Sequence, residues 1–325
     1  MVTLHSSPPI KRLLARRSLL GSFLLLLSVS QGCGVDESTK AYKNGLAALS
    51  RDDYDLAIAD FSEAIRLNPS CADAYDHRGW AYDEKRDYDK AIADYSEAIH
   101  LDPNYALAYD GRASAYEHKG DHDKAIADYS ELIRLHPEDA DGYEKRGSAY
   151  LAWGFPRTSK DNCDKAIADY SEVIRINTNS ARAYSWRADA YERRRDYDKA
   201  IADYSEAIRI KPDVLFYDDL ATLYTFCPDA NFRNGEKAVE YAKKACESSD
   251  RPQEELGMSK EMAHDWCLIS LADAYAQAGN FDEAIKCVNE LLRSNTSKDS
   301  DILRQRLSLY EQKKTYHQPS HDDER

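Results

Sequence analysis

A nine-residue string recurs along this chain at almost regular spacing, and it constrains the fold more than any other feature. The string Asp-Lys-Ala-Ile-Ala-Asp-Tyr-Ser-Glu begins at residues 89, 123, 164 and 198, and a near copy begins at Asp55. Successive copies are offset by 34, 34, 41 and 34 residues. A period of about 34 residues is typical of helical hairpins that bury a continuous core only by stacking on their neighbours. The sequence therefore predicts an all-α repeat array.

Apolar and small residues recur at helical spacing in both halves of each unit. Tyr75, Gly79 and Tyr82 share one face of a first half, and Ala91 and Tyr95 share one face of the following second half. A small residue recurs at the same position in the first half of each unit, where it lets the paired helices approach closely. We expect the tyrosine three residues later to fill the space above it. The small residues are Gly45, Gly79, Ala113, Gly147 and Ala188; the tyrosines are Tyr82, Tyr116, Tyr150 and Tyr191.

Helix boundaries are also marked at regular positions. Between the two helices of a unit, an aspartate stands where an N-cap would accept backbone amide protons, at Asp87, Asp121 and Asp196. A proline follows the second helix at Pro69, Pro103, Pro137 and Pro212, where its missing amide ends the helix. Each unit is therefore predicted to be a pair of amphipathic helices.

This succession of aromatic, Gly/Ala, Tyr, Ala, aromatic, Ala and Pro positions resembles the tetratricopeptide repeat (TPR) family. The resemblance implies a right-handed α-solenoid of helix-turn-helix repeats at residues 38–71, 72–105, 106–139, 140–180 and 181–214. The fourth repeat departs from the pattern, with seven extra residues within Trp153–Cys163 and Thr178 where proline is expected.

The remaining segments complete the predicted organisation. After the fifth repeat the pattern degenerates but is restored around Ala272, Tyr275 and Gly279, giving about seven units in all. The predicted order is a signal peptide at 1–32, a short linker at 33–37, five repeats at 38–214, two degenerate repeats at 215–298, a capping helix at 299–316 and a disordered tail at 317–325. In the cap, Ile302, Leu303, Leu307 and Tyr310 fall on one side, and we expect the charges on the other.

The N-terminal segment has the pattern of an export signal. Basic residues precede an apolar run from Leu19 to Val29, which is too short to span a bilayer, and small residues lead to Cys33. Gly32 and Cys33 resemble a bacterial lipobox, although Ser30 and Gln31 depart from it. Two interpretations stay open: Cys33 is lipidated, or it simply follows a cleavage site. Either predicts an exported protein of the cell envelope or periplasm, with membrane contact only through a lipid anchor.

Charge and motifs exclude several function classes. The chain carries 58 Asp+Glu against 44 Lys+Arg, a formal charge of -14, so the basic field that nucleic-acid binding requires is missing. The sequence has no P-loop, nucleophile elbow or zincin motif. His118 and His122 have the spacing of metal ligands, but Gly120 and Asp121 place a turn between them. We therefore expect a protein partner, no nucleic acid, no enzyme activity, no cofactor and no metal.

The cysteines leave two alternatives open. Six remain if Cys33 is lipidated: Cys71, Cys163, Cys227, Cys246, Cys267 and Cys287. Cys246 and Cys267 fall on helices that should be neighbours, and a disulfide between them would fix the degenerate end of the array. The alternative is buried or free thiols.

The TPR resemblance implies that the first helix of each pair lines a concave groove. The groove positions are Asp73, Asp76, Trp80, Asp83, Glu84, Asp110, Glu117, Asp141, Glu144, Arg182, Asp189 and Arg193. A row of carboxylates would steer and select a basic segment, and an exposed Trp80 is typical of binding hot spots. The alternative is that an acidic chain solvates every open face in this way.

We therefore expect a non-enzymatic scaffold or adaptor in the cell envelope that binds an extended or basic segment of a protein partner in the groove. The alternative is a structural or assembly component of an envelope complex, acting by self-association or through its convex face and the tyrosines of the second helices.

Overall fold

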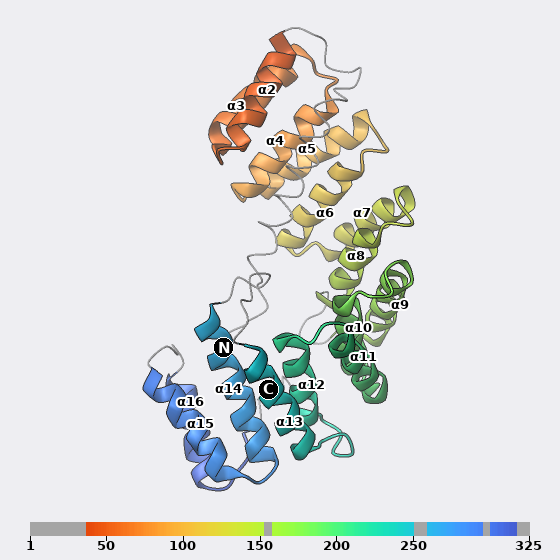
Figure 1. Ribbon diagram of the computed structural model, residues 1–325. Coiled ribbons are helices and arrows are strands. Elements are labelled where there is room, and N and C mark those ends of the chain that lie inside the picture. Colours follow the sequence, from red (N-terminus) through yellow and green to blue (C-terminus); the bar gives the residue numbers. More distant parts are fainter. Residues whose placement is uncertain (1–36, 153–157, 250–258, 295–299, 317–325) are drawn as a thin grey trace. The chain divides into compact units, whose positions relative to one another are not determined.

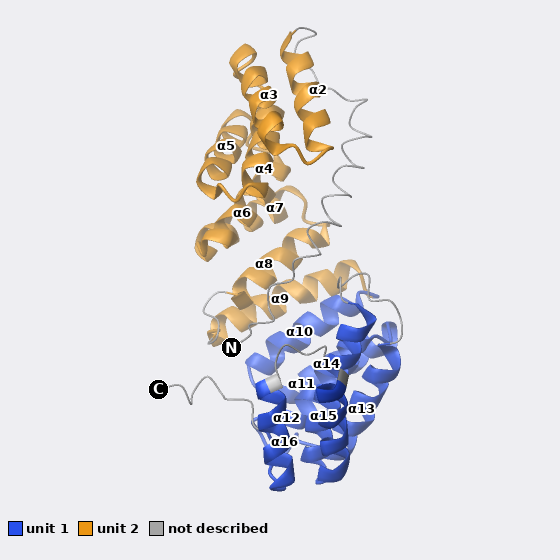
Figure 2. Ribbon diagram, turned by 90° about the vertical axis from the view of Figure 1, so that its left-hand side faces the viewer, with its two compact units in different colours: residues 1–17, 179–325 blue, residues 18–178 orange. Residues whose placement is uncertain are grey.

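A computed structural model describes residues 37–152, 158–249, 259–294 and 300–316 (Figure 1). These residues form fifteen α-helices and no β-strand, which confirms the predicted all-α solenoid of helical hairpins. They divide into two compact units, with the boundary between Thr178 and Asn179 (Figure 2). The predicted signal peptide, Cys33, residues 153–157 of the insertion and the tail lie outside the described residues.

The N-terminal unit consists of four helical hairpins. In each hairpin the first helix, here called helix A, packs against the second, helix B, and each hairpin packs against the next along the chain. The hairpins are α2 (Glu37–Leu49) with α3 (Tyr54–Leu67), α4 (Ala72–Glu84) with α5 (Tyr88–Leu101), α6 (Ala106–Lys119) with α7 (His122–Leu135), and α8 (Ala140–Ala152) with α9 (Lys160–Ile176).

The C-terminal unit consists of three hairpins and a final single helix. The hairpins are α10 (Ala181–Arg193) with α11 (Tyr197–Ile210), α12 (Val214–Phe226) with α13 (Gly235–Ser248), and α14 (Lys260–Gln277) with α15 (Phe281–Ser294), and α16 (Ser300–Glu311) packs on α15. Helix α14 begins five residues before Asp265, where the repeat pattern resumes, because the side chain of Ser259 accepts a hydrogen bond from the Met262 amide and caps it. No helix in the described ranges has both the length and the apolar character needed to cross a membrane.

The aspartates between paired helices occupy N-cap positions but form ion pairs there. Asp87 binds the Lys90 ammonium at 2.6 Å and Asp121 binds that of Lys124 at 3.0 Å, and neither side chain caps its helix. Asp196 likewise does not cap its helix and pairs instead with Arg194 at 3.0 Å and Lys199 at 3.6 Å. The expected capping role is therefore wrong for all three aspartates, because the lysine of the recurring string lies within reach in the first turn. In the first hairpin the near copy of the string has Leu56 in place of the lysine. There the side chain of Asp53 does accept a hydrogen bond, from the backbone amide of Leu56.

The hairpins close where an aromatic ring of helix B packs on a small residue of helix A. A Cβ atom built on Gly79 would lie 3.1 Å from the ring of Tyr95, and one on Gly147 would lie 2.9 Å from that of Tyr170. The rings that fill this space therefore come from helix B, which corrects the expectation for Tyr82 and its equivalents. Tyr82 instead has the Lys90 ammonium 5.2 Å from its ring centroid, and Tyr116, Tyr150 and Tyr191 have equivalent lysine neighbours.

An arginine of helix A joins successive hairpins. Arg112 makes two 2.8 Å hydrogen bonds to the carboxylate of Asp128 in its own hairpin and a 3.0 Å bond to the Ser96 hydroxyl of the preceding one. Asp128 is only 5 % exposed. Equivalent arginine–aspartate pairs occur at Arg78–Asp94, Arg146–Asp169 and Arg187–Asp203. Serine, arginine and aspartate linked in this way fix the positions of helices α4, α6 and α8, and therefore of the faces that these helices present.

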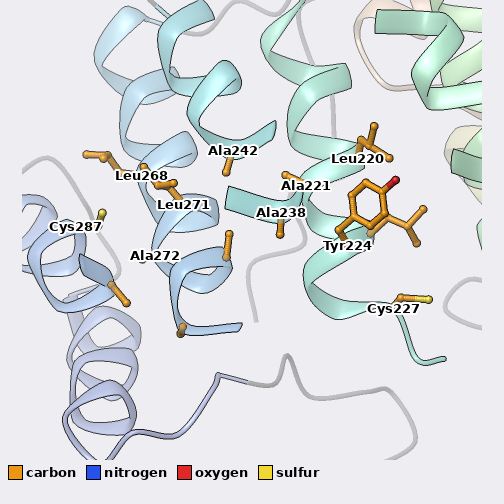
Figure 3. Close-up of a cluster of buried hydrophobic side chains, with 14 of the residues drawn as sticks. Leu220, Ala221, Tyr224, Cys227, Ala238, Ala242, Leu268, Leu271, Ala272 and Cys287 are labelled. Carbon is orange, nitrogen blue, oxygen red and sulfur yellow. The ribbon is translucent and has the colours of Figure 1, made fainter. Parts of the chain in front are cut away.

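The C-terminal unit has a continuous apolar core. Figure 3 shows side chains of α12, α13 and α14 meeting in it, among them Leu220, Ala242 and Leu271. At its end Arg306 and Tyr310 of α16 both donate hydrogen bonds to the buried carboxylate of Asp273. The expectation that all charges of the capping helix face solvent is therefore wrong for Arg306, because Asp273 offers it a buried partner.

Candidate functional site

The twelve predicted groove residues are divided between the two units. Nine lie on helices α4, α6 and α8 of the N-terminal unit, and Arg182, Asp189 and Arg193 lie on α10 of the C-terminal unit. In the N-terminal unit, five carboxylates of helices A form a surface that we call the acidic face: Asp73, Asp76, Asp110, Glu117 and Asp141. Electrostatic coupling joins Asp76 to both Asp73 and Asp110, so these carboxylates lie close together.

One cation of the protein itself lies on the acidic face. The Lys145 ammonium is 2.6 Å from Asp110 of α6 and 2.7 Å from Asp141 of its own helix, α8. Burial opposes the charge of Lys145, but the two carboxylates overcome this effect and raise its pKa. The face therefore holds a lysine ammonium between carboxylates of neighbouring helices A.

One repeat earlier the same contact has no lysine. Asp76 precedes Arg78 by two residues, as Asp110 precedes Arg112, and the residue that would correspond to Lys145 is Gly111. Gly111 carries no side chain to pair with Asp76, and the ring of Tyr95 packs over it, since a Cβ there would lie 2.5 Å from that ring.

Asp76 is consequently a buried carboxylate with a weak counter-ion. It is 8 % exposed, and its ion-pair partner among the described residues is His77, whose Nδ1 lies 3.8 Å from Oδ2. That nitrogen also lies 2.8 Å from the carbonyl oxygen of Asp73, to which it donates its proton. Burial, aided by the charges of Asp73 and Asp110 and opposed by His77, raises the pKa of Asp76 from 3.8 to about 6.

Aromatic and apolar side chains border these carboxylates. The Tyr105 hydroxyl donates a 2.6 Å hydrogen bond to Asp73, and the ring of Tyr42 meets that of His77 edge to face at 5.6 Å. Leu107, three residues before Asp110, is 56 % exposed. The acidic face thus combines carboxylates with an exposed aliphatic side chain and phenol rings.

Trp80 is less open than its sequence position suggested. The indole is half-buried against the core of the first hairpin, which includes Leu49 and Phe61, and its Nε1 lies 3.3 Å from Glu84. Its exposure was overestimated because position on a helix does not show how closely the preceding hairpin packs. Glu117 accepts a 2.8 Å hydrogen bond from Tyr129, while Asp83 and Glu144 lie on the same helices A, half-buried.

In the C-terminal unit the helix-A face is mixed in charge. Asp189 pairs with Arg193 at 3.0 Å, and the Arg182 guanidinium lies 4.6 Å from the centroid of the Trp186 ring. Burial and the charge of Asp189 raise the pKa of Glu192, one turn away, to about 7. Here the basic groups that the sequence placed in the groove are already occupied by neighbours on their own helix.

The residues that sequence reasoning missed are Lys145, Tyr105 and Leu107. Lys145 could have been found, because it occupies the position of Gly111 in an otherwise repeating pattern. The contribution of Tyr105 could not, because it precedes α6 and reaches back to α4, a contact between helices that no local pattern encodes.

The cysteine pair and the histidines can also be placed. Cys246 and Cys267 are free thiols within hydrogen-bonding reach of each other. His118 stacks on Tyr88 with ring centroids 4.9 Å apart. Within the described ranges, no group of three or more His, Cys, Asp or Glu side chains is arranged to hold a metal ion.

Comparison with known proteins identifies the repeat. A profile of the tetratricopeptide repeat matches residues 42–106, 78–140, 111–154 and 269–317, and a second tetratricopeptide repeat profile matches residues 181–214. No curated protein sequence matches the chain.

Solved structures share the fold. The MamA protein is 26 % identical with a TM-score of 0.50, over 54 % of this chain and 92 % of that one. A tetratricopeptide repeat protein from Parabacteroides merdae (18 % identity, TM-score 0.57) matches 85 % of this chain and 99 % of its own. The C-terminal part of a TPR repeat-containing protein from Cytophaga hutchinsonii is 19 % identical with a TM-score of 0.63, and the match covers 81 % of this chain and 98 % of that one. The helical hairpins, the recurring residues and these matches agree: the chain belongs to the tetratricopeptide repeat family.

Proposed function

We propose that this protein is a non-enzymatic scaffold for protein interaction whose N-terminal unit binds an extended, basic segment of a partner on the acidic face. Stacked TPR hairpins expose one long row of helices A, and such rows suit extended segments better than compact ligands. Membership in the TPR family supports a protein-interaction role in general. The choice of a basic segment rests on the residues of the acidic face.

The observation that carries the proposal is the contrast between Lys145 and Gly111. Asp110 has a lysine ammonium at 2.6 Å, whereas at the equivalent contact one repeat earlier Asp76 faces a glycine. Among the described residues, the cationic partner of the buried Asp76 carboxylate is His77 at 3.8 Å, so a lysine or arginine supplied by a partner would gain a closer, charge-assisted hydrogen bond there. The partner would thus do for Asp76 what Lys145 does for Asp110.

The surroundings of Asp76 favour a lysine or arginine with an apolar neighbour. Phenol rings near Asp76 and Asp73 can pack along the aliphatic part of a long basic side chain. Leu107 gives an apolar contact on the same face for an adjacent residue of the segment. We therefore propose a segment in which basic and small apolar residues alternate.

A direct binding measurement tests this function. The probe is a short fluorescein-labelled peptide of alternating lysine and alanine, compared with the same peptide carrying glutamate, and the readout is fluorescence anisotropy with the full chain. We expect the lysine peptide to bind with an affinity that falls as salt is added, and the glutamate peptide not to bind. Equal binding of the two peptides would contradict the proposal.

Matched variants locate the site. Asp76→Asn should weaken binding of the lysine peptide at least about tenfold, since a hydrogen bond to a charged group contributes about 1.5–3 kcal/mol. Asp123→Asn changes the net charge equally at an exposed position of helix α7 and should leave the affinity unchanged. If both variants lose the same affinity, binding follows net charge and the assigned site is wrong.

The proposed setting is the cell envelope, supported by the signal pattern of residues 1–32 and by the Gly32-Cys33 pair. Fractionation of a bacterial host and the mass of the mature N-terminus would distinguish a lipidated Cys33 from a cleaved, unmodified chain. A cytosolic chain that keeps residues 1–32 would contradict this setting. The alternative assembly role would use the tyrosines of helices B as a contact surface. These tyrosines are buried, because Tyr95, Tyr129, Tyr170 and Tyr204 are all under 5 % exposed.

A further inference from the structure

Three cysteines from three successive helices gather in the C-terminal unit. Cys246 of α13 lies within hydrogen-bonding reach of Cys267 of α14, and it also packs against the apolar core that contains Cys287 of α15. Figure 3 labels Cys287 in this core. All three are free thiols. Cys267 is fully buried and Cys287 is 9 % exposed, whereas Cys246 is half-buried.

We propose that Cys246 and Cys267 form a reversible disulfide that joins α13 to α14, with Cys246 as the thiol that reacts first. The oxidant is a disulfide-bearing molecule, RS–SR. The Cys246 thiolate attacks one sulfur of the oxidant, which gives a mixed disulfide and releases one RSH. Cys267 then attacks the Cys246 sulfur, which forms the internal bond and releases the second RSH. Two protein thiols are oxidised, one disulfide is reduced, and both thiol protons leave on the two RSH molecules.

Burial separates the roles of the thiols. The hydrogen bond to Cys246, burial and the charge of Asp218 raise the pKa of Cys267, and burial raises the pKa of Cys287 to about 11. The thiolate is the reactive form, so these two thiols are poor first nucleophiles at neutral pH. A buried Cys267 is also out of reach of a bulky oxidant. It can attack once Cys246 presents the mixed disulfide beside it.

The Cys246–Cys267 disulfide would cross-link the C-terminal hairpins, where the repeat pattern of the sequence is least regular. It would close the chain between α13 and α14, the two helices joined by the long connector around residues 250–258. A cross-link removes freedom mainly from the unfolded chain, so the oxidised C-terminal unit should resist unfolding more than the reduced one. The proposed disulfide involves no residue of the acidic face.

The test is an oxidation time course on the full chain. Reduced protein is incubated with oxidised glutathione, quenched, alkylated and digested, and the cysteine peptides are identified by mass. We expect a glutathione adduct on Cys246 early, replaced by a linked Cys246–Cys267 peptide, together with a higher melting temperature that a reductant reverses. A linked Cys246–Cys287 peptide in place of Cys246–Cys267, or three thiols that stay fully alkylatable, would overturn the assignment.

Variants separate the roles and guard against misfolding. Cys267→Ser with Cys287→Ser should trap the glutathione adduct on Cys246, and Cys246→Ser should abolish the adduct and the internal link. Cys163→Ser and Cys227→Ser, at buried thiols of α9 and of the end of α12, should leave the linked peptide unchanged. Because Cys246 is half-buried, Cys246→Ser should fold like the parent. Formation of a Cys267–Cys287 link in that variant would show that oxidation does not need Cys246 and would overturn its role.

Discussion

At the scale of single residues, the distance between paired helices depends on a small residue in the first helix. The ring of Tyr95 lies so close to Gly79 that an added Cβ would meet it at 3.1 Å and the Ala91 carbonyl oxygen at 3.3 Å. Two other hairpins carry alanine at this position, Ala113 and Ala188, both fully buried. A methyl group is therefore compatible with this hairpin geometry after a small shift of the ring.

The substitution Gly79→Leu should destabilise the N-terminal unit by about 1–3 kcal/mol, because the larger side chain forces Tyr95 and α5 away from α4. Gly79→Ala should be close to neutral, since a slight shift of the ring is offset by the higher helix propensity of alanine. Urea unfolding followed by circular dichroism measures both. Equal stability of parent and leucine variant would show that Tyr95 does not pack on this residue.

A second residue-scale prediction concerns Asp76 and pH. Because the folded pKa, about 6, lies above the unfolded value of 3.8, the folded chain binds the proton more tightly. The stability of the parent should therefore fall as the pH rises from about 4 to about 6. Asp76→Asn removes this cost and should be more stable than the parent at pH 7, by up to about 3 kcal/mol.

The check on Asp76 is the unfolding free energy of both chains across that pH range. The gap between parent and variant should close below about pH 4, where the carboxyl is neutral in both states. The variant would then be more stable but weaker in peptide binding, a separation that a merely structural carboxylate would not produce. A gap independent of pH would contradict the assigned titration.

At the scale of elements, the recurring string has a structural reason at most of its positions. In the copy beginning at Asp89, Lys90 pairs with Asp87 and Ala91 is buried in the hairpin core. Asp94 binds Arg78 of its own hairpin, and Tyr95 packs on Gly79. Ser96 accepts a hydrogen bond from Arg112 of the next hairpin. A string that contacts both its own and the following hairpin has little freedom to vary.

The arginine links should matter far more than the exposed ion pairs. Arg112→Met leaves the buried Asp128 without its counter-ion and should cost about 3–5 kcal/mol, and adding Asp128→Leu should recover most of this loss. The matched control is Lys119→Met, which removes an exposed ion pair with Asp89 and should cost less than about 1 kcal/mol. The measurement is the unfolding free energy of the parent, the two single variants and the double variant by denaturant titration. Equal losses of stability in the two single variants would show that the arginine link is not stabilising.

At the scale of the whole molecule, interchangeable hairpins predict tolerance of a precise deletion. Removing residues 106–139 joins Tyr105 to Ala140, which occupies the position of Ala106, and brings Ser96 to the hairpin of Arg146. The serine–arginine contact would then re-form between the second and fourth hairpins. We expect a soluble, helical, monodisperse chain by circular dichroism and light scattering. Aggregation of this variant, but not of the parent, would show that the hairpins are not interchangeable.

The repeating part of the molecule could be predicted from sequence, and the departures from the repeat could not. Period and phase placed the hairpins because each uses the same contacts at the same spacing. They did not show that Arg306 turns inward to Asp273, because its partner lies 33 residues away on the first helix of the preceding hairpin. For the candidate site they gave the acidic positions but not the burial of Asp76 or Trp80, which depends on how closely adjacent hairpins pack.

Within each compact unit a hairpin packs chiefly on its immediate neighbours along the chain, so the order of synthesis can also be the order of folding. The partner of Arg78 lies only 16 residues further on, so a hairpin can close soon after its second helix emerges. Local contacts of this kind are reached quickly and need no distant segment to arrive. The last two hairpins carry Cys246, Cys267 and Cys287. They would be the last to fold, so these three thiols would be the last to become buried in a newly made chain.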